Sequence, residues 1–152
     1  PDIYASDWAN NAKGNSTGRI YVYSGADGKK LLTLTGENAG DGFGIGSAEA
    51  GDVNRDGFDD LIIGAWQYAG AATSAGKVYL YSGKDGSLIS AMTCRIPGDT
   101  FGFDATGIGD VDGDGVIDLL LTSAWSGING YRSGRMFVIS GKMENRKPSE
   151  KF

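Results

Sequence analysis

Short runs of β-branched and aromatic residues recur along the chain, and glycine or a turn bounds each of them. Three runs share one form: a basic residue precedes them and Ser-Gly follows them. They occupy residues 20–23, 78–81 and 136–139. Runs with this composition and these boundaries predict β-strands.

Further strands are predicted around these three. Residues 60–63 and 118–121 each consist of an aspartate and a continuous apolar run, which is typical of strands buried on both faces. Asp-Gly turns precede apolar segments at 31–34 and 88–94, so each of those segments is predicted to pair with the strand before its turn. We find no helical pattern of ten or more residues, and the chain is therefore predicted to be all-β.

The pattern repeats with a period of 58 residues. The segment 19–25 recurs at 77–83 and again at 135–141, and Phe43 and Phe101 have the same spacing. Each full repeat offers about four strands, which is the content of one blade of a β-propeller. The predicted organisation is a partial first repeat at 1–40, a full repeat at 41–98, a repeat lacking its last strand at 99–141, and a polar tail at 142–152.

About two and a half blades do not close a propeller, which needs roughly four to eight. The end strands of such an open array expose backbone groups that pair readily with another chain. We therefore expect that the chain is a piece of a longer propeller or that copies of it associate.

Composition narrows the function. Glycine accounts for 26 of 152 residues, which fits many tight turns between short strands. The chain has no histidine and a single cysteine, Cys94, so histidine-dependent catalysis, histidine metal sites, internal disulfides and cysteine zinc sites are excluded. Cys94 alternates with apolar residues and is predicted to be a buried small hydrophobe.

Charge excludes two further classes of protein. The net charge is −5 and the sequence pI is about 4.6, with no basic cluster before the last eleven residues, which argues against nucleic-acid binding. The longest uncharged run, 61–76, contains glycine and polar residues and does not read as a membrane span. The sequence begins with Pro1, so a targeting segment could have preceded it.

Two acidic loops carry the clearest chemistry. Residues 52–60 and 110–118 place oxygen-bearing side chains at positions 1, 3, 5 and 9, with glycine at position 6. A short loop of this kind can wrap a hard cation, and flexible geometry favours Ca²⁺ over Mg²⁺. The predicted ligands of two Ca²⁺ sites are Asp52, Asn54, Asp56, the Phe58 carbonyl and Asp60 in the first loop, and Asp110, Asp112, Asp114, the Val116 carbonyl and Asp118 in the second.

An EF-hand is excluded, because its position-12 glutamate would fall on Ile63 or Leu121 and no helix follows. The remaining alternative is a pair of metal-free Asp/Asn/Gly turns. Clustered carboxylates repel one another without a cation, and the arrangement occurs twice in register, so we favour calcium. The second loop is predicted to bind more tightly, because all four of its side-chain ligands are aspartates and it lacks Arg55 of the first loop.

The segments 51–66 and 109–125 resemble FG-GAP repeats, the units of the integrin α-subunit propeller. The Phe-Gly half of that motif matches at 43–44 and 101–102, and the resemblance extends over residues 1–141. One departure is that tryptophan replaces the proline of the family's Gly-Ala-Pro. The resemblance implies a calcium-stabilised propeller in an extracellular or cell-surface protein, acting in adhesion or ligand binding.

Aromatic residues suggest an alternative, a lectin-like propeller. Three tryptophans begin equivalent loops, and rings there could stack on sugars. They could instead pack between blades, which the periodicity favours. The candidate ligand-binding residues are Trp8, Trp66, Trp125, Tyr68 and Tyr131.

An enzyme is not predicted. A glycosidase-like carboxylate pair would not need histidine, but Asp41 and Asp99 recur with the repeat and read as turn residues. A part of a secreted hydrolase is the least favoured alternative. We therefore expect a calcium-binding propeller segment that serves as a binding, adhesion or structural module for a protein or glycan partner.

Overall fold

The computed structural model describes residues 1–142, and ten β-strands account for the regular structure within them. The part of the polar tail from residue 143 onward lies outside the described residues. No helix capable of crossing a membrane occurs in the described part. The strands are β1 (Ile3–Asp7), β2 (Arg19–Tyr23), β3 (Lys30–Thr35), β4 (Phe43–Gly51), β5 (Asp60–Ala65), β6 (Lys77–Tyr81), β7 (Leu88–Thr93), β8 (Phe101–Gly107), β9 (Leu119–Ser123) and β10 (Arg135–Ile139).

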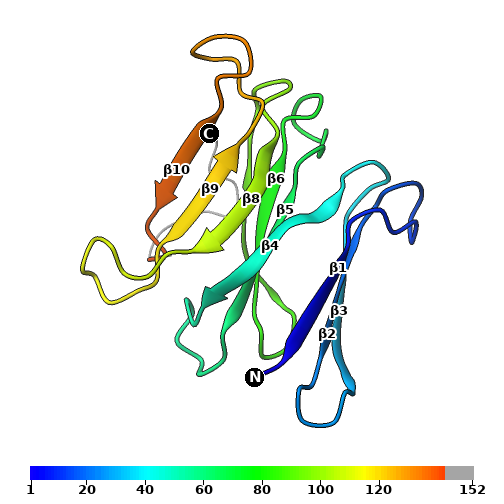
Figure 1. The fold of residues 1–152 in the computed structure, drawn as a ribbon, viewed down its shortest axis with the longest axis vertical. Coiled ribbons are helices and arrows are strands. Elements are labelled where there is room, and N and C mark those ends of the chain that lie inside the picture. Colours follow the sequence, from blue (N-terminus) through cyan, green and yellow to red (C-terminus); the bar gives the residue numbers. More distant parts are fainter. Residues whose placement is uncertain (143–152) are drawn as a thin grey trace.

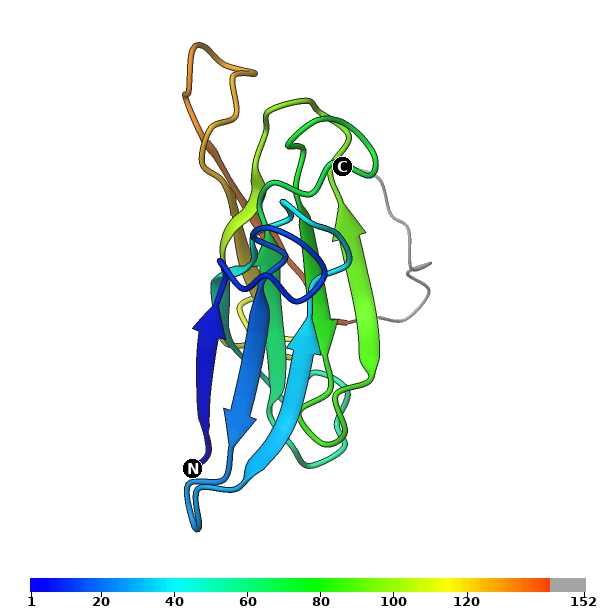
Figure 2. The same ribbon diagram turned by 90° about the vertical axis from the view of Figure 1, so that its right-hand side faces the viewer.

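The strands form three antiparallel sheets that fan out side by side (Figure 1). The first blade is β1-β2-β3, the second is β4-β5-β6-β7, and the third is β8-β9-β10. Figure 2 shows the first sheet at the near edge of the fan. The prediction of an all-β partial propeller with four antiparallel strands in its full blade is confirmed. Within residues 1–142, the first blade has no counterpart of β4 and the third has no counterpart of β7.

Adjacent blades bury their apolar faces against each other. Ile20 and Leu34 of the first blade pack with Phe43 and Tyr79 of the second. On the opposite face of the second blade, apolar side chains from β5, β6 and β7 pack with Phe101 and others from the third. Side chains that alternate between the two faces of the second blade therefore pack against two different neighbours, because this blade is covered on both sides.

Glycines allow these sheets to approach closely. A Cβ atom on Gly64 in β5 would overlap the carbonyl oxygen of Gly102 in β8, and one on Gly76 would overlap the carbonyl of Phe101. The blades thus touch through their backbones as well as their side chains. This contact accounts for part of the high glycine content, in addition to the turns that the sequence predicts.

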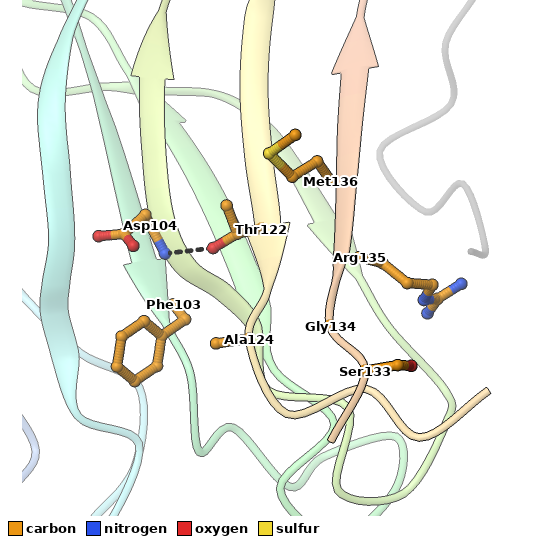
Figure 3. Close-up of a pocket in the computed structure, with 8 residues that line it drawn as sticks. All are labelled: Phe103, Asp104, Thr122, Ala124, Ser133, Gly134, Arg135 and Met136. Atoms are coloured by element: carbon orange, nitrogen blue, oxygen red, sulfur yellow. Dashed lines mark hydrogen bonds between the residues drawn. The ribbon is translucent and has the colours of Figure 1, made fainter. Parts of the chain in front are cut away.

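The outer face of the third blade is open. Met136 and Val138 are 74% and 60% exposed, whereas their equivalents one repeat earlier, Val78 and Leu80, are fully buried. Figure 3 shows the depression on this face, with Met136 beside it. A further blade or a second copy covering this face stays a prediction.

One position on that face differs from the second blade. Gly46 lies against the backbone of Phe103 in the next blade, with no room for a side chain. Its equivalent in the third blade is Asp104, whose backbone N–H donates to the Thr122 hydroxyl at 2.9 Å (Figure 3). A neighbour docking here must therefore accommodate a carboxylate where the second blade presents bare backbone.

Candidate metal centres in the acidic loops

The two acidic loops connect the first and second strands of the full and third blades. The first, residues 52–60, joins β4 to β5, and the second, residues 110–118, joins β8 to β9. The second loop projects at the lower left of Figure 1, at the end of the sheet away from the 124–134 loop. Glycine is required within them, since Gly57 and Gly115 both have φ above 80°.

The first aspartate of each loop organises the turn. Asp52 accepts hydrogen bonds from the backbone N–H groups of Asp56 and Gly57, both at 2.9 Å. Asp110 accepts the equivalent bonds from Asp114 at 3.0 Å and Gly115 at 2.8 Å. The same chain conformation therefore forms in both loops, as the sequence repeat requires.

The last aspartate ties each loop to its own blade. Asp118 is buried, and one of its oxygens accepts from the Val111 N–H at 2.8 Å. Its other oxygen accepts from the Gly141 N–H at 3.0 Å, at the end of β10. Asp60 makes the equivalent bond to Gly83 at 3.2 Å, and Asp2 makes it to Gly25 at 3.0 Å.

These contacts explain the Ser-Gly that follows β2, β6 and β10. A Cβ atom on Gly83 or Gly141 would overlap a loop carbonyl, so only glycine fits there. The serine hydroxyls donate to the position-5 aspartates at 3.3 Å, Ser82 to Asp56 and Ser140 to Asp114. These serines were not connected with the acidic loops from sequence, although their recurrence with the repeat was a signal of that connection.

The environment affects the acidity of the two closing aspartates in opposite directions. Burial raises the pKa of Asp60, and backbone N–H groups offset this only in part. The N–H of Val111 and those of Gly141 and Asp112 hold the pKa of Asp118 below its ordinary value, against the effect of burial. Asp118 is thus the better stabilised carboxylate of the pair, with its charge available to a cation.

Carboxylate oxygens converge in the second loop. One oxygen each from Asp110, Asp112 and Asp118 lies within 4.8 Å of the others. In the first loop Asn54 replaces Asp112, so one carboxylate becomes an amide oxygen, which still suits a hard cation. A hydrogen-bonded turn thus brings together ligands that are all oxygen atoms, and oxygen is the ligand type that Ca²⁺ prefers. The carbonyls of Phe58 and Val116 stay predicted ligands.

The aromatic candidates lie at the opposite end of the strands and do not form one cluster. Trp66 packs edge to face against Phe103 and Trp125, with ring centroids 5.6 and 5.3 Å apart. Its indole N–H is buried and has no hydrogen-bond partner among residues 1–142. Trp66 therefore packs between blades. Tyr68 lies under the Lys77 ammonium, 4.7 Å from its ring centroid.

The other aromatic candidates are more exposed. Trp8 and Trp125 are 44% and 43% exposed, and Tyr131 is 90% exposed. The Arg132 guanidinium lies 4.8 Å from the Trp125 ring and 5.3 Å from the Tyr131 ring. The structure thus places Trp125, Tyr131 and Arg132 together on one loop, between β9 and β10.

Asp41 and Asp99 are buried in the structure. The sequence pattern alone predicts that these two recurring acids are turn residues. Asp99 forms an ion pair with Arg135 across the loop that enters the third blade, and Cys94 donates a long S–H bond to it at 3.5 Å. Burial raises the pKa of the Cys94 thiol, so the predicted inert, buried cysteine is consistent with the structure.

Comparison with known proteins identifies the family to which the repeat belongs. The family model described as FG-GAP repeat matches residues 46–81, which include the first acidic loop. The chain carries FG-GAP repeats. The match contains β5 and β6 with the loop that precedes them, so the sequence resemblance and the observed blade coincide.

Integrin α subunits are among the proteins related to this chain. Integrin alpha-5 of Xenopus laevis is 31% identical over 150 residues, covering 91% of this chain and 14% of that protein. Integrin alpha pat-2 of Caenorhabditis elegans is 36% identical over 108 residues, and integrin alpha-3 of Cricetulus griseus is 34% identical over 119. These two alignments cover 66% and 70% of this chain, and 9% and 11% of the relatives. The FG-GAP chain therefore spans a small fraction of the proteins that it matches.

Proposed function

We propose that this FG-GAP chain is a calcium-binding segment of an extracellular adhesion propeller and has no enzymatic role. The observation that supports the proposal is the hydrogen-bonded frame that both acidic loops share, together with the convergence of carboxylate oxygens in the second loop. The integrin α relatives support an extracellular, adhesion-related setting.

In this proposal calcium stabilises the ends of the blades. The residues that would hold it are those at positions 1, 3, 5, 7 and 9 of each loop, and the ion would supply neutralising charge to their oxygens. Asp56 and Asp114 link each loop to the serine after the third strand. Binding would therefore strengthen the connection between a loop and its own blade.

Calcium is expected to raise the melting temperature, and EDTA to reverse the effect. Extracellular modules bind Ca²⁺ with dissociation constants near 10⁻⁴–10⁻³ M, so 10 mM calcium would stabilise the fold by about 1–3 kcal/mol per site. Asp114→Ala is expected to lose more of this stabilisation than Asp56→Ala, because four of the predicted side-chain ligands in the second loop are carboxylates and only three in the first. Thermal unfolding with and without calcium measures both.

The control is Asp104→Ala, which removes an exposed carboxylate outside the loops. Its calcium response should equal that of the unaltered chain. Equal melting temperatures in calcium and in EDTA would contradict calcium binding. A larger loss in Asp56→Ala than in Asp114→Ala would contradict the proposed order of affinities.

We place the partner-binding surface on the loop that carries Trp125, Tyr131 and Arg132. Exposed Trp, Tyr and Arg side chains are the residue types that dominate protein–protein binding energy. A lectin-like role needs an open ring face for a sugar, whereas Arg132 covers the Trp125 ring and Trp66 packs against it. A protein partner is therefore favoured over a glycan.

A panel of soluble glycans at millimolar concentration is expected to leave tryptophan fluorescence unchanged. Arg132→Ala, which uncovers the Trp125 ring, serves as a comparison and should remain unresponsive as well. A saturable fluorescence change that is abolished by Trp125→Ala would overturn the protein-partner proposal in favour of the glycan alternative.

A further inference from the structure

A side chain of the first acidic loop donates a hydrogen bond to the backbone of the second. Arg55, at position 4 of the first loop, donates from Nη2 to the carbonyl oxygen of Gly115 in the second loop at 3.0 Å. The contact joins residues 60 positions apart and crosses from the second blade to the third. It is a polar contact between the two predicted sites, and it has no counterpart within either loop alone.

The backbone at Arg55 is unfavourable for an arginine. Its φ is 61°, in the left-handed region, and the equivalent residue of the second loop is Gly113 with φ of 81°. Glycine adopts this conformation freely, whereas a residue with a side chain does so at a free-energy cost. An arginine at this position goes against the backbone preference for glycine. Its side chain there makes the hydrogen bond to Gly115.

The peptide that Arg55 holds is part of the second loop's frame. The N–H of Gly115 donates to Asp110, and the Gly115 carbonyl belongs to the same planar peptide as the Val116 N–H. That N–H donates to Asp114 at 2.9 Å. Fixing the Gly115 carbonyl therefore fixes the Val116 N–H, which orients Asp114. It also fixes the backbone at the beginning of Val116, whose own carbonyl is a predicted ligand.

On its own loop, Arg55 lies between two predicted ligands, Asn54 and Asp56. An ion bound by those neighbours would order the backbone at position 4 and with it the direction of the arginine side chain. We propose that Arg55 couples the two acidic loops, so that calcium in the first loop raises the affinity of the second. This inference rests on the proposed calcium-binding function.

Charge does not reverse the direction of this coupling. The guanidinium is positive whether the first loop is empty or filled, so its repulsion of an ion sets the baseline affinity of the second loop. Repulsion between two bound ions is reduced by counter-ions at 0.15 M salt and by the carboxylates that each ion neutralises. Ordering of the Gly115–Val116 peptide is the term that depends on occupancy of the first loop.

Isothermal titration calorimetry with CaCl₂ in 0.15 M NaCl tests the coupling in four chains: the unaltered chain, Asp56→Ala, Arg55→Met, and the double variant. Arg55→Met keeps side-chain length and the backbone constraint of a non-glycine residue but removes the donor. Asp56→Ala is expected to weaken the second loop three- to tenfold when Arg55 is present, and less than twofold in the Arg55→Met background.

Arg95→Met removes an exposed arginine elsewhere and should behave like the unaltered chain, while near-UV circular dichroism verifies that each variant is folded. Asp56→Ala could change the calcium affinity of the second loop equally with Arg55 present and in the Arg55→Met background, or change it in neither. Either result would overturn the coupling and leave calcium binding intact. A folded, unaltered chain that binds no calcium would overturn both the coupling and the proposed function.

Discussion

Gly64→Ala is expected to lower the free energy of unfolding by about 3 kcal/mol, as an overpacked core position does. The new methyl group would overlap the carbonyl oxygen of Gly102 in the neighbouring blade. Both partners are backbone atoms in paired strands, so neither can move aside as a flexible side chain can. The second and third blades would have to separate to accept the methyl group.

Gly127→Ala is the matched control, because the nearest atom to its added methyl, the Gly130 carbonyl oxygen, lies 3.8 Å away. Urea unfolding followed by circular dichroism should show a large fall in the midpoint for Gly64→Ala and a change within about 0.5 kcal/mol for Gly127→Ala. A Gly64→Ala variant as stable as the control would contradict the backbone contact between blades.

Arg135→Met is expected to destabilise the fold by about 3 kcal/mol at neutral pH, because it leaves a buried carboxylate without its cation. The Asp99 side chain is fully buried, whereas that of Arg135 is 21% exposed. Burial alone would raise the pKa of Asp99, but nearby hydroxyls of Ser123 and Ser126 and the Arg135 guanidinium lower it below its ordinary value. Asp99 is therefore charged in the native state at neutral pH.

The pH dependence of this variant has a definite sign. A lowered native pKa contributes stability above the unfolded pKa, and that contribution is lost as the pH falls through the native pKa. Without Arg135 the buried charge is penalised instead, and protonation relieves it. The deficit of Arg135→Met should therefore be largest near pH 7, and it should shrink as the pH falls through the raised pKa of Asp99 in the variant and then through the lowered pKa of Asp99 in the unaltered chain.

Lys29→Met is a suitable control for the ion pair, because Lys29 and Asp27 form a pair with side chains 81% and 45% exposed. Removing an exposed pair usually changes stability by less than about 1 kcal/mol. A pH-independent deficit in Arg135→Met would mean that the arginine acts through packing alone. A deficit no larger than that of Lys29→Met would contradict a structural role for the buried pair.

Much of the fold could be predicted from local pattern, because each strand carries its own signal. The aromatic and β-branched run at β6 and its copies at β2 and β10 specify strands wherever they occur. The fixed spacing then groups them into blades. The two acidic loops were predictable for the same reason, since positions 1, 3, 5, 6 and 9 of each lie within nine consecutive residues.

Contacts between side chains far apart in the sequence were not predictable in this way. The burial of Asp99 depends on the loop that folds against the third blade, and its partner Arg135 lies 36 residues away. A signal did exist, because a basic residue begins β2, β6 and β10 and an aspartate recurs before each Phe-Gly. Whether such residues meet depends on packing: in the second blade Lys77 pairs with Glu37 instead of Asp41.

The role of Trp66 illustrates the same limit. Periodicity suggested that the tryptophans pack between blades, and Trp66 does so against Phe103 and Trp125. Trp125, one repeat later, is partly exposed and lies against Arg132. Equivalent positions in a repeat share backbone geometry, but their burial depends on what covers the particular blade.

The number of calcium ions bound per chain tests the central claim most directly. Equilibrium dialysis of the unaltered chain against ⁴⁵Ca²⁺ at millimolar concentration should reach two ions per chain, as the two acidic loops predict. Asp56→Ala and Asp114→Ala should each reduce this to one. A chain that binds no calcium at these concentrations, or whose bound calcium is unaffected by both substitutions, would contradict calcium binding by the acidic loops.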